Sequence, residues 1–277
     1  MRVYWMKLDH FLTPQHDPVV YVYQDRGVSH GSFYHTVATL QDVGCVVRPL
    51  TALELIQGHW QHHAYALVMP GGADIPYHMA LKGAGNAVIA EYVRSGGRYM
   101  GICAGAYYAA EHIVFHHSCG EYMSQERELG FFPGTIHGPF WGPYDPHCPS
   151  GATALAISSV HNPHRTWHTY MHGGGQFCLT PRRASACDQV TQEPLIQPLW
   201  IDQRGHWVAV VCGVGLGVAL LSACHWEWMP NRPSVFDCGD SENTMVAKDY
   251  QQWSSDPESL MSAAKEMVYG GGHLVLP

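Results

Sequence analysis

The chain has little charge and no run of basic residues. Of its 277 residues only 14% are charged, with 15 Lys and Arg against 23 Asp and Glu. The formal net charge of −8 argues against nucleic-acid binding, which needs a basic patch. The sequence also lacks internal repeats and long low-complexity linkers. Its hydrophobic content of 46% predicts a compact globular protein rather than a disordered one.

Paired cysteines and a leader-type segment are also missing. None of the nine cysteines forms a Cys-x-x-Cys pair, and the opening MRVYWMKLDHFLTPQH has no apolar stretch of signal-peptide type. We therefore expect reduced thiols in a cytoplasmic protein. The segment HHSC at 116–119 could supply half of a metal site, but it has no matching second pair of ligands. We predict no metal and no cofactor.

One uncharged stretch raises the question of a membrane span. The segment VAVVCGVGLGVALLSAC at 208–224 is at the short limit for a spanning helix. Glycines at 213, 215 and 217 interrupt its centre, and valines lie on both sides of them. A β-hairpin of two buried strands explains this pattern better, so we predict no membrane span.

Strand and helix signals alternate along the first two-thirds of the chain. The sequence predicts strands at 18–23, 45–50, 63–72 and 98–102, and helices at 32–43, 85–97 and 104–113. Thr51 and Glu54 have the spacing of a capping box. Such alternation predicts an α/β fold with a parallel sheet covered by helices on both faces. Ligands of such sheets gather at the carboxyl ends of the strands.

The remaining chain gives weaker signals. Residues 114–200, and 131–151 in particular, are rich in Pro, Gly, His and Trp and predict irregular loops with short antiparallel strands. HGGGQF at 172–177 predicts a tight turn between strands. Near the end, Asp256 and Pro257 predict a helix that stops before Gly270. We expect one domain over 1–277, with a core at about 18–230 and a C-terminal extension, about 231–277, that carries one helix.

The segment GICAGAYY at 101–108 is the most informative local motif. Cys103 lies where a predicted strand turns into a predicted helix, with Gly101 and Gly105 two positions away on either side. Small residues at these positions avoid collisions across the strained turn of a nucleophile elbow. The start of a helix also favours thiolate over thiol. Cys103 is therefore a candidate nucleophile, although Gly-x-Cys-x-Gly alone also fits a buried structural thiol.

A second strand end supplies the partners that a thiolate nucleophile needs. In LLSACHWEW at 220–228, His225 and Glu227 are two residues apart, so extended backbone would point both side chains to the same side. Donors for an oxyanion could come from the Ala104 amide and from the turn at Gly71 and Gly72. Since all these elements lie at predicted strand ends, together they favour an acyl-transfer site.

At these residues the sequence resembles a known family. The blocks VYVYQDRGVSHGSFYHTVATL, VMPGGADIPY, GAGNAVIAEYVRSGGRYMGICAGAYYA, RELGFFPGTIHGP, HGGGQF and LLSACHWEW are similar to successive blocks of the N-terminal domain of eukaryotic biotin–protein ligases. They cover most of residues 18–228 in order. That domain belongs to the class I glutamine amidotransferase-like superfamily.

The resemblance implies a flavodoxin-like three-layer sandwich with a mostly parallel central sheet. It also implies a Cys–His–Glu triad of Cys103, His225 and Glu227, with Gly72 and Ala104 as oxyanion donors. The usual His-Pro-Glu reads His-Trp-Glu in this chain. The biotin-binding signature of the ligase catalytic domain is absent, so we expect a freestanding form and predict no biotinylation.

Two classes of function follow from these residues. The first is a cysteine-dependent amidotransferase or hydrolase that cleaves a C–N bond of a small-molecule amide through a thioester, with a separate synthase or acceptor protein as partner. The alternative is a catalytically silent small-molecule-binding or regulatory module. Its pocket would be lined by aromatic and histidine residues that could equally well just pack, namely Phe140, Trp141, Tyr144, His137 and His147. A redox sensor that uses Cys103 is a third interpretation.

Overall fold

The structure, a computed structural model, describes residues 17–117, 119–145, 151–179, 195–229, 232 and 257–269. The helical elements are α1 (His30–Asp42), α2 (Ala52–Gln57), the 3-10 helix η2 (His59–His63), α3 (Asp74–Leu81), α4 (Ala84–Arg94), α5 (Ala104–Tyr108) and α7 (Pro257–Tyr269). The first strands are β1 (Val19–Tyr23), β2 (Val46–Leu50), β3 (Ala66–Met69), β4 (Arg98–Ile102), β5 (Ala110–His116), β6 (Tyr122–Glu126) and β7 (Phe132–Gly138). The later strands are β8 (Thr153–Ser159), β9 (Asn162–Met171), β10 (Gln176–Leu179), β11 (Ile196–Asp202), β12 (Trp207–Val214) and β13 (Gly217–Ser222).

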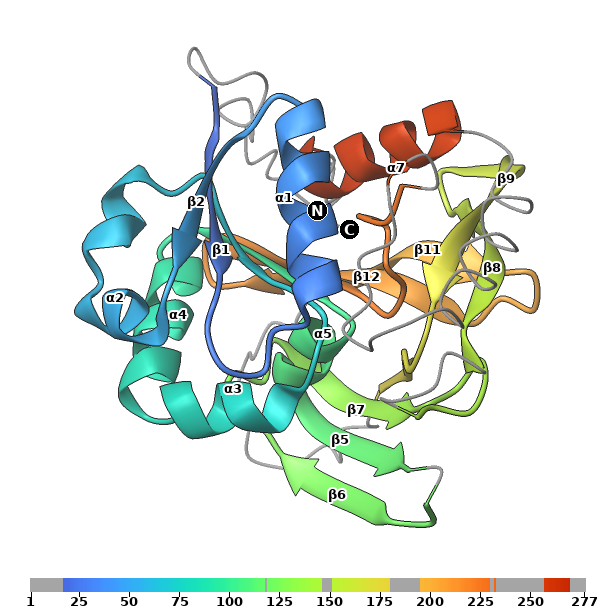
Figure 1. Cartoon of the computed structure of the whole chain (residues 1–277), viewed down its shortest axis with the longest axis horizontal. Helices are drawn as coiled ribbons and strands as arrows, with labels where there is room; N and C mark the ends of the chain where they lie inside the picture. The colour runs from blue at the N-terminus through green and yellow to red at the C-terminus, as the bar shows by residue number, and fades with distance from the viewer. Residues whose placement is uncertain are drawn as a thin grey trace, which may run out of the picture.

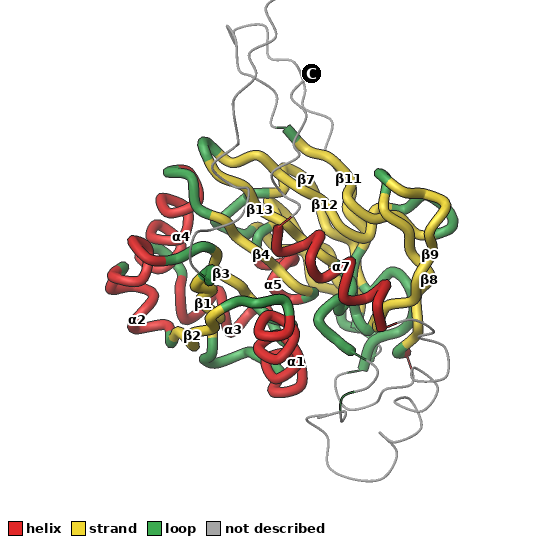
Figure 2. Tube along the Cα trace, turned by 90° about the horizontal axis from the view of Figure 1, so that it is seen from above, coloured by secondary structure: helices red, strands yellow, loops and turns green. Residues whose placement is uncertain are grey.

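The main sheet has a parallel half and an antiparallel half. Among the described residues its strand order is β2-β1-β3-β4-β13-β12-β11-β8-β9. The ladders from β2 to β13 are parallel and those from β13 to β9 are antiparallel. Figure 2 shows these strands as one continuous layer. The parallel half has the strand order of a flavodoxin-like fold. The predicted α/β fold is confirmed in this parallel core, and the sheet as a whole is mixed.

Helices cover both faces of the parallel half. On one face α1 packs on β1 and β2 and against α7, and these two helices lie beside each other in Figure 1. On the other face α4 packs on β4 and β13, while α5 packs on β3 and β4. A second sheet, of order β10-β7-β5-β6, continues from α5 through β5. The turns after β1, β3, β4 and β13 therefore emerge at the same edge of the sheet.

Several local predictions are confirmed. Thr51 and Glu54 form both hydrogen bonds of the capping box that starts α2. The hairpin at 208–224 is β12 and β13, and β13 lies parallel to β4 as the site hypothesis required. The described part of the C-terminal region contains the expected helix, α7, whereas its cap, Asp256, lies outside the described residues. No described helix is both long and apolar enough for a membrane span.

The predicted helix at 104–113 is wrong in its second half. Helix α5 ends at Tyr108, and β5 begins at Ala110. Buried and exposed residues roughly alternate along β5, and the strand pairs with both β6 and β7. The helical propensity of the alanines is therefore overridden by pairing with strands that lie outside the predicted helix.

The region at 131–151 is more regular than its composition predicts. It begins with β7, a seven-residue strand that pairs parallel with β5 and antiparallel with β10. Pro133 and Pro139 lie near the two ends of this strand, and the Gly138–Pro139 peptide bond is cis. Pro133, Gly134, Gly138 and Pro139, which suggested a loop, thus belong to a strand and its exit turn.

Helix α1 contains a fully buried histidine, His35. The His35 ring stacks on Trp228, with 4.3 Å between ring centroids, and neither ring nitrogen has a hydrogen-bond partner among the described residues. Burial, reinforced by the nearby charges of Arg232 and His225, lowers the pKa of His35 to about 3. The folded protein therefore holds this ring neutral.

This buried ring makes stability depend on pH. The pKa of His35 lies near 6.5 in its ordinary state and about 3 in the fold, so below pH 6.5 the unfolded chain binds more protons. The stability that His35 contributes is fully present above that pH and is lost as pH falls toward 3. We expect His35→Phe to reduce the pH slope of the free energy of unfolding by up to ~1.4 kcal/mol per pH unit. Urea unfolding between about pH 6 and 4 measures this slope.

The matched control is His62→Phe, because the His62 ring is exposed to solvent on η2. The pH slope of the free energy of unfolding of His62→Phe should equal that of the unsubstituted protein. Parallel slopes for the unsubstituted protein and His35→Phe would contradict the proposed neutral state of the buried ring.

Candidate active site

Cys103 occupies a strained turn between β4 and α5. Its backbone has φ 48° and ψ −102°, and it is the one non-glycine residue with positive φ in the described part of the chain. Such a conformation costs about 1–3 kcal/mol and persists only where the surroundings enforce it. The Cys103 amide donates to the Ser222 carbonyl at 2.8 Å, which ties the turn to the end of β13. This is the geometry of a nucleophile elbow.

The two glycines around Cys103 allow this turn to pack. A Cβ atom on Gly101 would lie 2.5 Å from the Gly105 carbonyl oxygen. A Cβ atom on Gly105 would lie 2.0 Å from the carbonyl oxygen of Met69, the last residue of β3. Neither backbone contact can be relieved by rotating a side chain. The spacing Gly-x-Cys-x-Gly therefore has the steric cause that the sequence suggested.

His225 and Glu227 come together in a turn rather than in an extended strand. Strand β13 ends at Ser222, and the Trp228 amide donates to the His225 carbonyl at 3.2 Å. The His225 amide also donates to the Tyr170 carbonyl at 2.8 Å, which fixes the turn against the end of β9. The two side chains do meet as predicted, but the reason that extended backbone would align them is wrong.

The pair formed by His225 and Glu227 is buried and charged. His225 Nδ1 donates to Glu227 Oε1 at 2.8 Å, and Glu227 is fully buried. Burial alone would lower the pKa of His225, but the Glu227 charge, the interaction with Cys103 and the hydrogen bond to Glu227 outweigh it. Together they raise the pKa of His225 to about 10. The imidazole therefore holds a proton near neutral pH.

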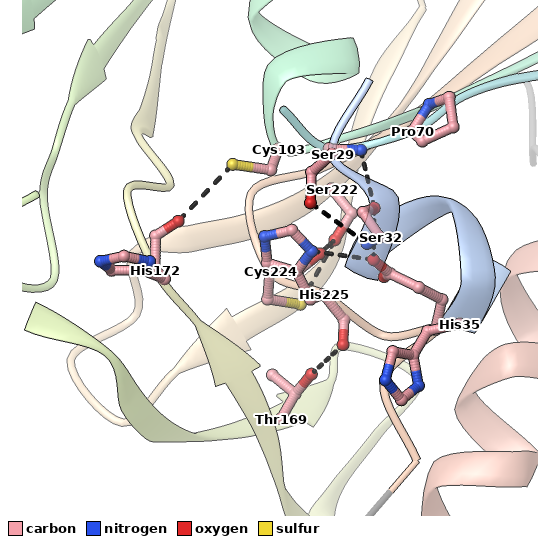
Figure 3. Close-up of polar contacts among 12 residues, drawn as sticks. Ser29, Ser32, His35, Pro70, Cys103, Thr169, His172, Ser222, Cys224 and His225 are labelled. Atoms are coloured by element: carbon pink, nitrogen blue, oxygen red, sulfur yellow. Dashed lines mark hydrogen bonds and ion pairs between the residues drawn. The ribbon is translucent and has the colours of Figure 1, made fainter. Parts of the chain in front are cut away.

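The Cys103 sulfur lies between two groups from different strands. Its thiol contacts the His172 carbonyl oxygen at 3.6 Å, as Figure 3 shows. The Cys103 side chain also contributes to the raised pKa of His225, so the two groups are close enough to interact. Cys103 is 8% exposed, so the sulfur is close to the surface but covered. Cys103, His225 and Glu227 thus lie in one row across the carboxyl ends of β4 and β13, in which His225 and Glu227 are hydrogen-bonded to each other.

The Gly71–Gly72 turn at the end of β3 faces this row. The Gly71 amide donates to Ser32 Oγ at 2.8 Å, so this amide is already engaged and is not free to bind an oxyanion. A Cβ atom on Gly71 would lie 2.6 Å from His225 Cε1, which explains the glycine at this position. In the described part of the chain, the Gly72 and Ala104 amides have no hydrogen-bond acceptor. They remain the candidate oxyanion donors.

Sequence reasoning missed Ser32. Its hydroxyl donates to Glu227 Oε1 at 2.9 Å and accepts from the Gly71 amide, both as buried contacts. Ser32 lies within a segment that the sequence correctly predicts as helical, and no local pattern singles it out. Only the packing of α1 against the end of β3 brings this residue to the site.

The aromatic and histidine-rich segment is divided between the site and its surroundings. The Tyr144 ring contacts the His172 ring, with 4.8 Å between centroids, and so lies beside the Cys103 contact. Trp141 donates from its indole nitrogen to Asp202 instead, and Phe140 packs on Trp141. His147 lies outside the described residues.

No metal site accompanies these side chains in the described ranges. No group of three or more His, Cys, Asp or Glu residues in them is arranged to hold an ion. In the segment HHSC, Cys119 is exposed and His116 ends β5.

Comparison with known proteins identifies the family. A profile described as "Biotin-protein ligase, N terminal" matches residues 19–266. An uncharacterized protein of Chlamydia muridarum is 32% identical over 237 residues, which is 83% of this chain and 86% of that protein. The biotin–protein ligase of Schizosaccharomyces pombe is 25% identical over 245 residues, which is 83% of this chain but only 37% of the ligase.

Among solved structures, the chain is similar to PurLQS from Thermotoga maritima, with a TM-score of 0.49 and 11% identity. That likeness covers 85% of this chain and 98% of the other. The fold class is given by the strand order of this chain. The family match, in contrast, spans almost all the elements that form the site, and it confirms the resemblance seen in the sequence. The chain belongs to the biotin–protein ligase N-terminal family.

Proposed function

We propose that this protein is a cysteine-dependent hydrolase or amidotransferase that acts on the C–N bond of a small-molecule amide. The observation that carries the proposal is the strained Cys103 turn, whose side chain interacts with a histidine that is hydrogen-bonded to a buried carboxylate and holds a proton. A cationic imidazole next to a sulfur stabilises the thiolate, which is the reactive form of cysteine. The resemblance to class I glutamine amidotransferases supports the same chemistry.

In the proposed reaction, the Cys103 thiolate attacks the carbonyl carbon of the amide. A C–S bond forms as the carbonyl π bond breaks, and the amide N–H groups of Gly72 and Ala104 stabilise the charge that develops on oxygen. The C–N bond then breaks, and His225 gives its proton to the leaving amine. Water attacks the resulting thioester and transfers a proton to His225. The carboxylic acid leaves, and the Cys103–imidazolium pair is restored.

The partner and the location of the reaction belong to the same proposal. An amidotransferase passes its amine to an acceptor, so we propose that a separate synthase or acceptor protein receives it. We place the reaction in the cytoplasm, because the free cysteines of the described residues are typical of a reducing compartment.

Loss of the nucleophile provides the test of this proposal. We expect a panel of primary amides, glutamine included, to contain a substrate from which the purified protein releases ammonia. Cys103→Ala should reduce that rate at least ~10³-fold, since no other group can form the thioester. The matched control is Cys178→Ala, which removes a partly exposed thiol on β10 and should keep the full rate. Equal ammonia release by the unsubstituted protein and Cys103→Ala would refute the proposal.

A specific contact favours the catalytically silent module as a second candidate. The Cys103 thiol donates to the His172 carbonyl, and a thiolate cannot keep that hydrogen bond. A protein that uses this pocket only for binding would keep the thiol and would release no ammonia from any amide. In a thermal-shift screen of small amides and carboxylates, such a module would be stabilised equally with and without the Cys103 sulfur.

A further inference from the structure

One buried hydroxyl group connects the histidine–carboxylate pair with the glycine turn. Ser32 Oγ lies 2.9 Å from Glu227 Oε1 and 2.8 Å from the Gly71 amide nitrogen. The same carboxylate oxygen, Oε1, accepts the His225 Nδ1 hydrogen at 2.8 Å. Ser32 itself is 1% exposed, so water does not compete for these bonds. The contacts around His225 and Ser32 are drawn in Figure 3.

The direction of each hydrogen bond is fixed by chemistry. The Gly71 amide can only donate, and an ionised carboxylate can only accept. The Ser32 hydroxyl must therefore accept from Gly71 and donate to Glu227. The hydrogen bond from the Gly71 amide to Ser32 and the hydrogen bond from Ser32 to Glu227 therefore run in the same direction. Buried hydrogen bonds arranged in such a chain strengthen one another.

The carbonyl group of Gly71 is also held by hydrogen bonds. Its carbonyl oxygen accepts from the Ser29 amide at 3.0 Å and from the Tyr77 hydroxyl at 3.2 Å. The peptide unit is planar and trans, so a fixed Gly71 carbonyl fixes the opposite direction of the Gly72 N–H. The start of α1 thus binds both polar groups of Gly71, because Ser32 accepts from its amide and the Ser29 amide donates to its carbonyl.

We propose that Ser32 is a positioning residue that couples the His225–Glu227 pair to the Gly71–Gly72 turn. One hydroxyl group then holds the base, His225, and an oxyanion donor, the Gly72 amide, in fixed positions relative to each other. The inference rests on the proposed function, because it assigns catalytic use to the Gly72 amide. Removing the hydroxyl leaves the Gly71 amide without an acceptor, and the glycine turn gains freedom to rotate.

Two electrophiles separate this role from a merely structural one. Iodoacetamide alkylates a thiolate by direct displacement, whereas chloroacetone reacts faster when donors polarise its carbonyl oxygen. The rate constant for chloroacetone is divided by the rate constant for iodoacetamide, and this ratio is divided by the same ratio for a small free thiol. The result reports how strongly the oxyanion donors act on the carbonyl oxygen. Peptide-level mass spectrometry restricts both measurements to Cys103. We expect Ser32→Ala to lower this ratio about tenfold, less than the loss of an oxyanion donor itself.

The controls lie on the same helix. Thr36 is fully buried, and its hydroxyl has no partner among the described residues, so Thr36→Val removes a hydroxyl of no role and should keep the ratio. Ser32→Thr retains a hydroxyl and should restore much of it. Where Ser32→Ala does not fold, Ser32→Cys replaces it, since a thiol keeps most of the volume but is a poor donor and acceptor.

The outcomes distinguish the two proposals. A ratio that falls in Ser32→Ala but not in Thr36→Val supports the coupling. A raised ratio in the unsubstituted protein that survives in folded Ser32→Ala overturns the coupling and leaves the proposed function standing. If iodoacetamide alkylation at neutral pH is no faster than for a free thiol and is indifferent to His225→Ala, the proposed function fails and this inference with it.

Discussion

The buried Glu227 carboxylate, which pairs with His225, joins segments that are far apart in the sequence, because it also accepts a hydrogen bond from Ser32. A fully buried carboxylate costs several kcal/mol unless it is paired and hydrogen-bonded. Glu227 gains its partners from its own turn through His225 and from α1 through Ser32. Thr39, also on α1, donates to the Glu227 carbonyl at 2.6 Å. Both side-chain bonds reach Oε1, and Oε2 has no partner among the described residues. The contacts of Glu227 therefore hold α1 and the end of β13 relative to each other.

The strain at Cys103 depends on the same packing. The Cys103 amide bonds to Ser222 on β13, and Gly105 lies against the Met69 carbonyl on β3. The elbow is thus held by the neighbouring strand on each side of β4. A site of this kind needs rigid supports, because a strained backbone relaxes wherever its surroundings allow. The flavodoxin-like strand order provides them by placing four turns at one edge.

Local sequence patterns predict those parts of the site that depend on local geometry. Gly101, Cys103 and Gly105 reveal the elbow because the collision that Gly101 avoids lies within these five residues, although Gly105 is also confined by Met69 on β3. The parallel core follows from alternating strand and helix signals. Ser32 could not be predicted, since its role arises from a contact 195 residues away in sequence. The helix expected at 104–113 failed for a similar reason, because β5 owes its conformation to β6 and β7. The hydrogen bond that engages the Gly71 amide could not be predicted either, because it depends on the position of α1.

The titration of the His225 imidazole tests the central claim most directly. Nitrogen chemical shifts of labelled histidine, assigned with His225→Gln, follow it in the unsubstituted protein and in Glu227→Gln. We expect the pKa of His225 to lie near 10, far above the ordinary 6.5, and to fall by more than about one unit when the Glu227 charge is removed. A His225 that titrates near 6.5 in the unsubstituted protein, indifferent to Glu227, would contradict the assembled row of Cys103, His225 and Glu227.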